Sequence, residues 1–199
     1  MAKRHLACVL AMTVAACGPA SPGPSVQALL DSYAPSLQIG GRVSTSAHQR
    51  YNLRVSPYAG YRDAGYSAGE GISDLVIMVD EHVDDGDPHV SPRARIKSVS
   101  LGVADSASIE RLVARVDSAL GTPTTACYRS SDAGRFIARY WPGESRRGVF
   151  LVVRRADSAG PPPRNAITPV GSGTITFGAE NLLSPPVQET PETCPGDSA

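Results

Sequence analysis

The alternation of apolar and polar residues predicts two amphipathic helices. Ser25 begins the first helix, whose apolar residues Val26, Leu29, Leu30 and Tyr33 lie at i, i+3, i+4 and i+7. Pro35 ends it because proline lacks the amide that a helix needs. A second, longer helix begins at Asp105 or Ser106, either of which can cap it, and ends at the stop signal Gly121. The apolar stripe of this helix consists of Ile109, Leu112, Val113, Val116 and Leu120.

Residues with a period of two predict strands after the first helix. Residues 51–55 alternate apolar and polar side chains, which predicts a half-buried strand, and the Tyr- and Gly-rich stretch 57–67 predicts a loop or an irregular hairpin. The unbroken apolar run 75–79 is typical of a central strand covered on both faces. Ile96–Val103 predicts the next strand, so the acidic stretch 80–92 connects the two.

Further strands are predicted after the second helix, over 125–129, 135–141 and 149–155. Three consecutive prolines from Pro161 then break the chain, because proline cannot donate to a strand ladder. Residues 174–177 could add one edge strand. The chain from Leu183 onward is predicted to be a linker, except where Cys194 pins it.

The order of these elements predicts the fold class. A helix followed by strands occurs twice, which is typical of an α+β fold with helices on one face of antiparallel sheet. We therefore expect two helix-plus-antiparallel-sheet units, 25–104 and 105–156, packed together. A Pro/Gly-rich extended tail, 157–199, follows them.

The N-terminal residues form a signal of a recognisable kind. Lys3 and Arg4 precede the apolar run 6–14, which leads through two alanines to Cys17. This pattern resembles the lipobox of bacterial lipoproteins. The resemblance implies that a signal peptide, 1–16, is removed and that Cys17 carries diacylglycerol and an N-acyl chain such as palmitate. A plain secretory signal is the alternative, and the run is too short to span a bilayer, which takes about 20 residues.

The same resemblance implies a location in the cell envelope. Residues 17–24 would be the lipidated tether, rich in Pro, Ser and Gly. Gly18 follows the cysteine, whereas the sorting rule of enteric lipoproteins places Asp there for the inner membrane, so the outer membrane is favoured over the inner. The charges are balanced, with 19 Lys and Arg against 19 Asp and Glu, which argues against a nucleic-acid partner.

The cysteine count predicts one disulfide bond. Cys8 lies in the predicted signal peptide and Cys17 would carry lipid, so Cys127 and Cys194 remain as an even pair. In an oxidising compartment such a pair is expected to be bonded. A catalytic thiol at Cys127 and two free thiols are the alternatives.

An acidic stretch carries the side chains best suited to a metal. Carboxylates and imidazoles are ligands of Ca²⁺ and Zn²⁺, and the candidates here are His82, Asp84, Asp85, Asp87 and His89. Their spacing matches neither an EF-hand loop nor H-E-x-x-H. We therefore predict an exposed loop, with no metal and no cofactor other than the lipid. An envelope metal-dependent hydrolase centred on this loop is the alternative.

A group of tyrosines marks a candidate binding loop. Tyr58, Tyr61 and Tyr66 lie close together in a stretch predicted to be a loop, and loops carry function more often than their share. Tyrosine is enriched at recognition surfaces, because it buries a large area at a low entropic cost. It is an equally good strand residue. A tethered binder of a small ligand, with a pocket behind this loop, is a second alternative.

The second helix and its strands carry a resemblance to known modules. The stretch 108–153 runs from the helix through Leu120-Gly121-Thr122-Pro123 to strands that contain Tyr140-Trp141. It resembles β-lactamase-inhibitor-protein-like domains and is similar to the small outer-membrane assembly lipoproteins with that layout. The resemblance implies a lipid-anchored module that binds other proteins. We therefore expect a non-enzymatic binding or adaptor protein with a protein partner in the envelope.

Overall fold

The computed structural model describes residues 26–57, 59–63, 65–83, 89–130, 134–143, 147–155, 171–180 and 189–194. These residues form an α+β fold. The helices are α1 (Val26–Tyr33), α2 (Thr45–Tyr51) and α3 (Ser106–Leu120). The strands are β1 (Arg54–Ser56), β2 (Gly60–Arg62), β3 (Ser67–Gly69), β4 (Ile72–Val79), β5 (Ile96–Val103), β6 (Thr124–Ser130), β7 (Gly134–Trp141), β8 (Gly148–Arg155), β9 (Gly173–Ala179) and β10 (Glu189–Glu192).

All ten strands belong to one antiparallel sheet. Its order is β1-β2-β4-β5-β9-β8-β7-β6-β10, and β3 pairs with β4 away from this path. Strand β9 therefore lies in the middle, between β5 and β8, and joins the strands that precede α3 to those that follow it. The prediction of an edge strand over 174–177 is wrong in its position. Ile175 and Phe177 are fully buried and need neighbours on both sides, which the short run did not reveal.

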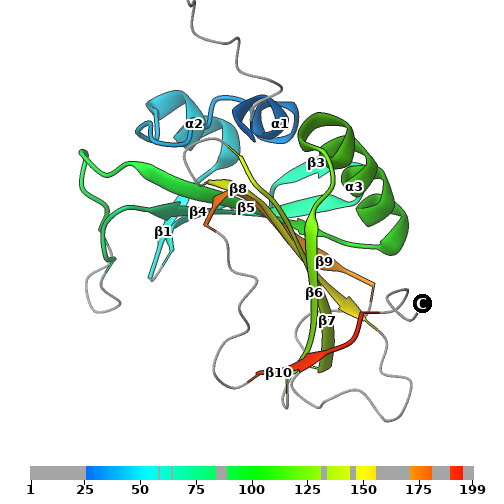
Figure 1. Cartoon of the computed structure of the whole chain (residues 1–199). Helices are drawn as coiled ribbons and strands as arrows, with labels where there is room; N and C mark the ends of the chain where they lie inside the picture. Colours follow the sequence, from blue (N-terminus) through cyan, green and yellow to red (C-terminus); the bar gives the residue numbers. More distant parts are fainter. Residues whose placement is uncertain are drawn as a thin grey trace, which may run out of the picture.

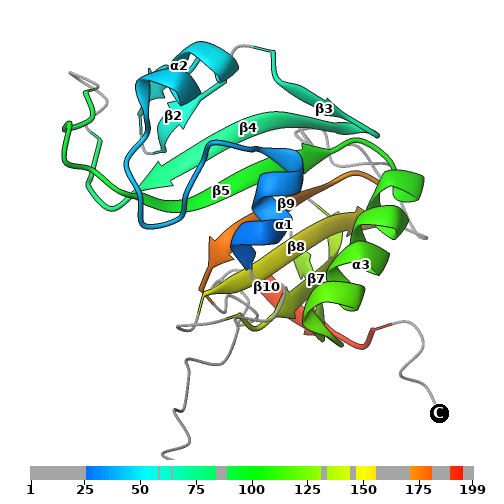
Figure 2. The same cartoon turned by 90° about the horizontal axis from the view of Figure 1, so that it is seen from above.

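The helices pack on one face of the sheet (Figures 1 and 2). The predicted stripe of α1 is buried, and the ring of Tyr33 lies 6.0 Å from that of Phe177 on β9. Helix α3 begins as expected, because the Asp105 carboxylate accepts from the Ser108 amide at 2.8 Å. Its Asp117 accepts a hydrogen bond of 2.8 Å from the indole of the fully buried Trp141 on β7. These contacts fix the covered face.

Helix α2 replaces the strand predicted over 51–55. Ser44 caps the helix through a hydrogen bond from the Ala47 amide, and Asn52 ends it in the left-handed conformation, with φ of 47°. The strand prediction is wrong because these two caps outweigh the short alternation of apolar and polar residues that begins at Tyr51. Only β1, from Arg54, is extended, and it pairs with β2, which lies in the stretch predicted to be a loop or an irregular hairpin.

Several sequence predictions concern residues that the structure does not describe. These are the signal peptide 1–16, the tether 17–24 with Cys17, and the side chains of Tyr58, Asp84, Asp85 and Asp87. Within the described part of the chain, no helix combines the length and apolar character that a membrane crossing requires.

Candidate functional site

The register of the strands sorts side chains onto two faces of the sheet. Val99, Phe177 and Val149 lie side by side on the face that the helices cover. Their chain neighbours Ser100, Thr176 and Phe150 lie side by side on the opposite face, which we call the open face. Among the described residues, no helix lies over the open face (Figure 1).

One half of the open face, over β6, β7 and β8, is aromatic. Tyr128 lies opposite Phe136, and Tyr140 lies opposite Phe150. The Tyr128 and Phe136 rings are stacked, with centroids 5.4 Å apart and planes inclined by 20°. Burial raises the pKa of the Tyr140 hydroxyl, whereas Tyr128, Phe136 and Phe150 are half-buried. We call these four residues with Val152 the aromatic surface. Stacked pairs of this kind stabilise a sheet and also suit recognition.

The other half of the open face, over β4, β5 and β9, is polar. The Ser100 and Thr176 hydroxyls are hydrogen-bonded at 2.8 Å. A hollow of about 630 Å³ lies beside them, and Asp74 and Arg62 place opposite charges on its rim. We call it the hydroxyl hollow, and its lining is Arg62, Ser73, Asp74, Val76, Ser100, Gly102, Val103, Ala104, Ser172, Gly173 and Thr174.

The position of Asp74 explains the shape of the hydroxyl hollow. Asp74 occupies the left-handed region, with φ of 51°, at a β-bulge of β4. Its carboxylate accepts from the Ser73 hydroxyl at 3.0 Å and lies over Gly102, where a Cβ would be only 3.1 Å from the nearer carboxylate oxygen. Glycine at position 102 therefore admits the Asp74 side chain. No sequence pattern pointed to this site.

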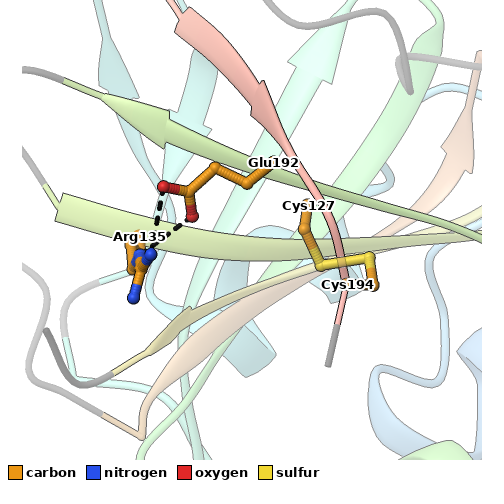
Figure 3. The surroundings of a disulfide bond; sticks show 4 residues. All are labelled: Cys127, Arg135, Glu192 and Cys194. Carbon is orange, nitrogen blue, oxygen red and sulfur yellow. Dashed lines mark hydrogen bonds and ion pairs between the residues drawn. A yellow bond between two sulfur atoms is a disulfide. The ribbon is translucent and has the colours of Figure 1, made fainter. Parts of the chain in front are cut away.

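A third feature fastens the end of the described chain to the sheet. Strand β10 pairs with β6, placing Glu192 opposite Cys127. The predicted disulfide between Cys127 and Cys194 is present, with 5.2 Å between the two Cα atoms (Figure 3). We call β10 together with Cys194 the C-terminal clasp.

Ion pairs add to the C-terminal clasp. The Glu192 carboxylate contacts the Nε atoms of Arg129 at 2.9 Å and Arg135 at 2.8 Å. Desolvation opposes the ionisation of Glu192, but the hydrogen bonds from Arg135 and Arg129 outweigh it and hold the pKa of that carboxyl below its usual value. The clasp therefore carries a negative charge that matches two arginines of β6 and β7.

Tyr61 and Tyr66 of the candidate binding loop pack against α2 and its surroundings. Tyr61 is buried, and its ring lies edge-on to His48 at 4.8 Å. Tyr66 donates to the Tyr33 carbonyl, and its ring packs edge-on against Tyr51 at 5.4 Å. Burial raises the pKa of Tyr66 to about 12. A hollow of about 490 Å³, lined in part by Tyr33, Tyr51 and Tyr66, lies beside them.

The acidic stretch connects β4 to β5. Its described ends are tied down, because Asp80 accepts from the Arg95 amide at 2.8 Å and Glu81 accepts from the Ser91 amide. His82 and His89 lie among the described residues, whereas the three aspartates between them do not. Within the ranges that the structure describes, no three His, Cys, Asp or Glu side chains gather closely enough to hold a metal ion.

The open face therefore carries two candidate sites, the aromatic surface over β6, β7 and β8 and the hydroxyl hollow over β4, β5 and β9. No known protein family, curated protein or solved structure matches this chain. The sequence pattern singled out Tyr140, in the pair Tyr140-Trp141, but not Phe136 or Phe150. The period of two along β7 and β8 was the available signal, since the helix-facing positions alternate with these aromatic residues.

Proposed function

We propose that this chain is a lipid-anchored protein of the cell envelope that binds a protein partner through the aromatic surface. The observation that carries this proposal is the contrast within the open face. Ser100 and Thr176 give one half of that face the hydroxyls usual where a sheet meets water, while Tyr128, Phe136 and Phe150 make the other half aromatic. Aromatic side chains that no helix covers favour recognition, because burying them contributes large area at low entropic cost.

The chemistry of the aromatic surface fits binding better than catalysis. It offers stacked rings and aliphatic carbon, which supply apolar contact area, with the buried Arg154 opposite Phe136, and its described residues bring together no nucleophile with a base. Partner proteins are commonly held by such central aromatic residues within a polar rim. Arg154 on β8 is the basic side chain of this half of the open face. A surface that binds a partner protein and catalyses no reaction would give the chain an adaptor role.

The lipid anchor rests on the N-terminal pattern. In this proposal the signal peptide is removed before Cys17, the lipids insert into the outer membrane, and residues 17–24 let the body stand away from the bilayer. We further propose that the body comprises two helix-plus-sheet units, 25–104 and 105–156. Strand β9 would be the element that joins their sheets, because it pairs with β5 on one side and β8 on the other.

Crosslinking in the native envelope tests this function. A photo-reactive crosslinker attached to the protein should capture one predominant envelope protein, identified by mass spectrometry. The double variant Phe136→Ser and Phe150→Ser should lower the captured amount at least about tenfold, the loss typical of a hot-spot residue. The matched control is Met78→Ser, which removes a half-buried apolar side chain from the other half of the same face. Equal capture by both variants would disprove the aromatic surface as the site.

The hydroxyl hollow supports a second candidate function, the binding of a small polar ligand by the tethered protein. Its specific observation is the left-handed Asp74, since backbone strain of this kind clusters at functional sites. The carboxylate of Asp74 and the guanidinium of Arg62 would orient a ligand that bears both charges. Thermal-shift screening with amino acids and short peptides tests it, and Asp74→Asn should abolish any stabilisation found.

The hydrolase alternative has a separate test in the acidic stretch. Calorimetry with added Ca²⁺ or Zn²⁺ should show no stoichiometric binding, because the spacing of these residues matches no metal motif. Replacing Asp84, Asp85 and Asp87 with Asn should change the unfolding free energy by at most about 0.5 kcal/mol per site, as for exposed positions. A micromolar binding event that these substitutions abolish would favour the hydrolase instead.

A further inference from the structure

We infer that the hollow beside Tyr33, Tyr51 and Tyr66 binds a small sugar acid, a ligand that carries one carboxylate and several hydroxyl groups. We call this site the tyrosine hollow. The inference goes beyond the proposed function, because the tyrosine hollow shares no lining residue with the aromatic surface or with the hydroxyl hollow. It rests on how the walls are fixed, on their charge and on the polar groups that they present.

Three separate segments form the walls of the tyrosine hollow. They are the end of α1 together with Pro35, the last residues of α2, and residues 65–68. The Tyr51 hydroxyl donates to the Pro35 carbonyl, and the Tyr66 hydroxyl donates to the Tyr33 carbonyl. Both hydrogen bonds fasten a wall to the C-terminal end of α1, so the rings are held in place before a ligand binds.

A carboxylate outside the tyrosine hollow fixes the wall at residues 65–68. Asp63 accepts hydrogen bonds from the amides of Gly65 at 2.8 Å and Leu75 at 2.6 Å, and also from the amide of Tyr66. Because Leu75 belongs to β4, these bonds connect the wall to the sheet. A site whose groups are already ordered loses little conformational entropy when a ligand binds.

The charge of the lining favours an anionic ligand. Among the described residues that line the tyrosine hollow, Arg50 is the one charged side chain. Its guanidinium carbon lies 5.8 Å from the centre of the Tyr51 ring, which is a cation–π distance. No carboxylate of the described residues forms an ion pair with Arg50. A guanidinium in this position can bind a carboxylate through two parallel hydrogen bonds.

Carboxylates near the tyrosines do not reverse this preference. Asp31, Asp63 and Glu70 act electrostatically on the three tyrosine hydroxyls, but none of them lines the tyrosine hollow. Three amides already bind Asp63. A second cation, Arg115, lies 5.3 Å from the centre of the Tyr33 ring. The lining therefore suits a ligand with one negative charge.

The rest of the lining suits a ligand that also carries hydroxyl groups. Ser32 and Ser67 contribute hydroxyl groups, and a ligand without polar atoms would leave such groups unsatisfied. The Ser32 hydroxyl donates to the Leu29 carbonyl at 2.7 Å, so it can accept a hydrogen bond from a ligand. Tyr66 adds apolar ring surface for the C–H groups of a sugar ring. A volume of about 490 Å³ is within the range of small-molecule sites.

Titration of the isotope-labelled full chain with glucuronate, followed by NMR, tests the inference. We expect saturable shifts of the amide signals of Gly65, Ser67 and Ala68 at millimolar ligand, because these residues line the tyrosine hollow. Arg50→Gln removes the charge and keeps a side chain of similar length, and it should weaken binding at least about tenfold. The matched control is Arg54→Gln, an exposed arginine of β1 outside the lining, which should bind glucuronate as the unchanged chain does.

Two further ligands separate the parts of the inference. Glucose has the hydroxyl groups without the charge, and acetate has the carboxylate without the hydroxyl groups. Each should bind at least about tenfold more weakly than glucuronate. Acetate that binds as tightly as glucuronate would overturn the sugar acid as the ligand, and glucose that does so would overturn the role of charge. Absence of saturable shifts with glucuronate, or equal binding by Arg50→Gln with native circular dichroism, would overturn the site.

Discussion

Removal of the disulfide should destabilise this chain through its unfolded state. The variant is Cys194→Ser in a chain that also carries Cys8→Ser and Cys17→Ser, and the reference is the same chain with Cys194 intact. Cys194 is the better position to change, because it is only half-buried, whereas Cys127 is buried in the sheet. The Ser substitution thus leaves no cavity in the core, and the loss reports the cross-link.

The size of the effect follows from the loop that the bond closes. Cys127 and Cys194 are 67 residues apart. In the chain-entropy relation, a loop of that length restricts the unfolded chain by about 4 kcal/mol at 25 °C. The unfolding free energy should therefore fall by about 4 kcal/mol, which is a large share of the 5–15 kcal/mol typical of a domain.

Urea unfolding monitored by Trp141 fluorescence measures this loss, at a concentration where light scattering shows monomers. The m value should rise, because an unfolded chain without the cross-link exposes more surface. A fall of less than about 1 kcal/mol with an unchanged m value would refute the reasoning. It would show that the unfolded chain is not restricted by the bond between Cys127 and Cys194.

Three further predictions concern other parts of the molecule. Trp141→Phe should lower the unfolding free energy by about 2 kcal/mol in urea, because it removes the buried hydrogen bond to Asp117; Asp117→Asn keeps an acceptor and should cost less. The Ser108 amide and hydroxyl hold the pKa of Asp105 below its usual 3.8, so the cap stabilises the fold above that pH and is lost as the pH falls through the lowered value. The unfolding free energy of Asp105→Asn should therefore fall less between neutral and acid pH than that of the unchanged protein. Unfolding of both proteins measured over the same acid pH range checks this, and an equal fall in both would contradict it. Cys17→Ala should leave an unprocessed or soluble protein, and normal mature mass in the membrane fraction would contradict lipidation.

Local patterns predicted those elements whose ends are set by neighbouring residues. Helix α3 follows from the Asp105 cap and the Gly121 stop, and β5 from the alternation of Val99, Leu101 and Val103. Helix α2 was not predicted because it is only about two turns long and buries only Ala47 and Tyr51. Its caps were therefore the main sequence signal. Strand pairing is decided by residues far apart in the chain, and no local pattern places β9 between β5 and β8.

The candidate site was harder to predict than the fold. The period of two divides Phe136 and Tyr140 from their neighbours, but only the packing of α1 and α3 decides which set faces the helices. The Asp74 side chain depends on a bulge and on the missing side chain at Gly102, and the sequence does not show that these two positions lie together. The disulfide could be predicted, since cysteine counting needs no geometry.

The central place of β9 has a consequence for how the protein forms during synthesis. Residues 173–179 leave the ribosome after every other strand except β10, yet they occupy the middle of the sheet. Until they arrive, β5 and β8 each present an unpaired edge, and the earlier strands cannot be completed as one sheet. Nascent chains shorter than about 173 residues therefore stay incompletely folded. Such a delay leaves the edges of β5 and β8 open to pairing with other chains until residues 173–179 arrive.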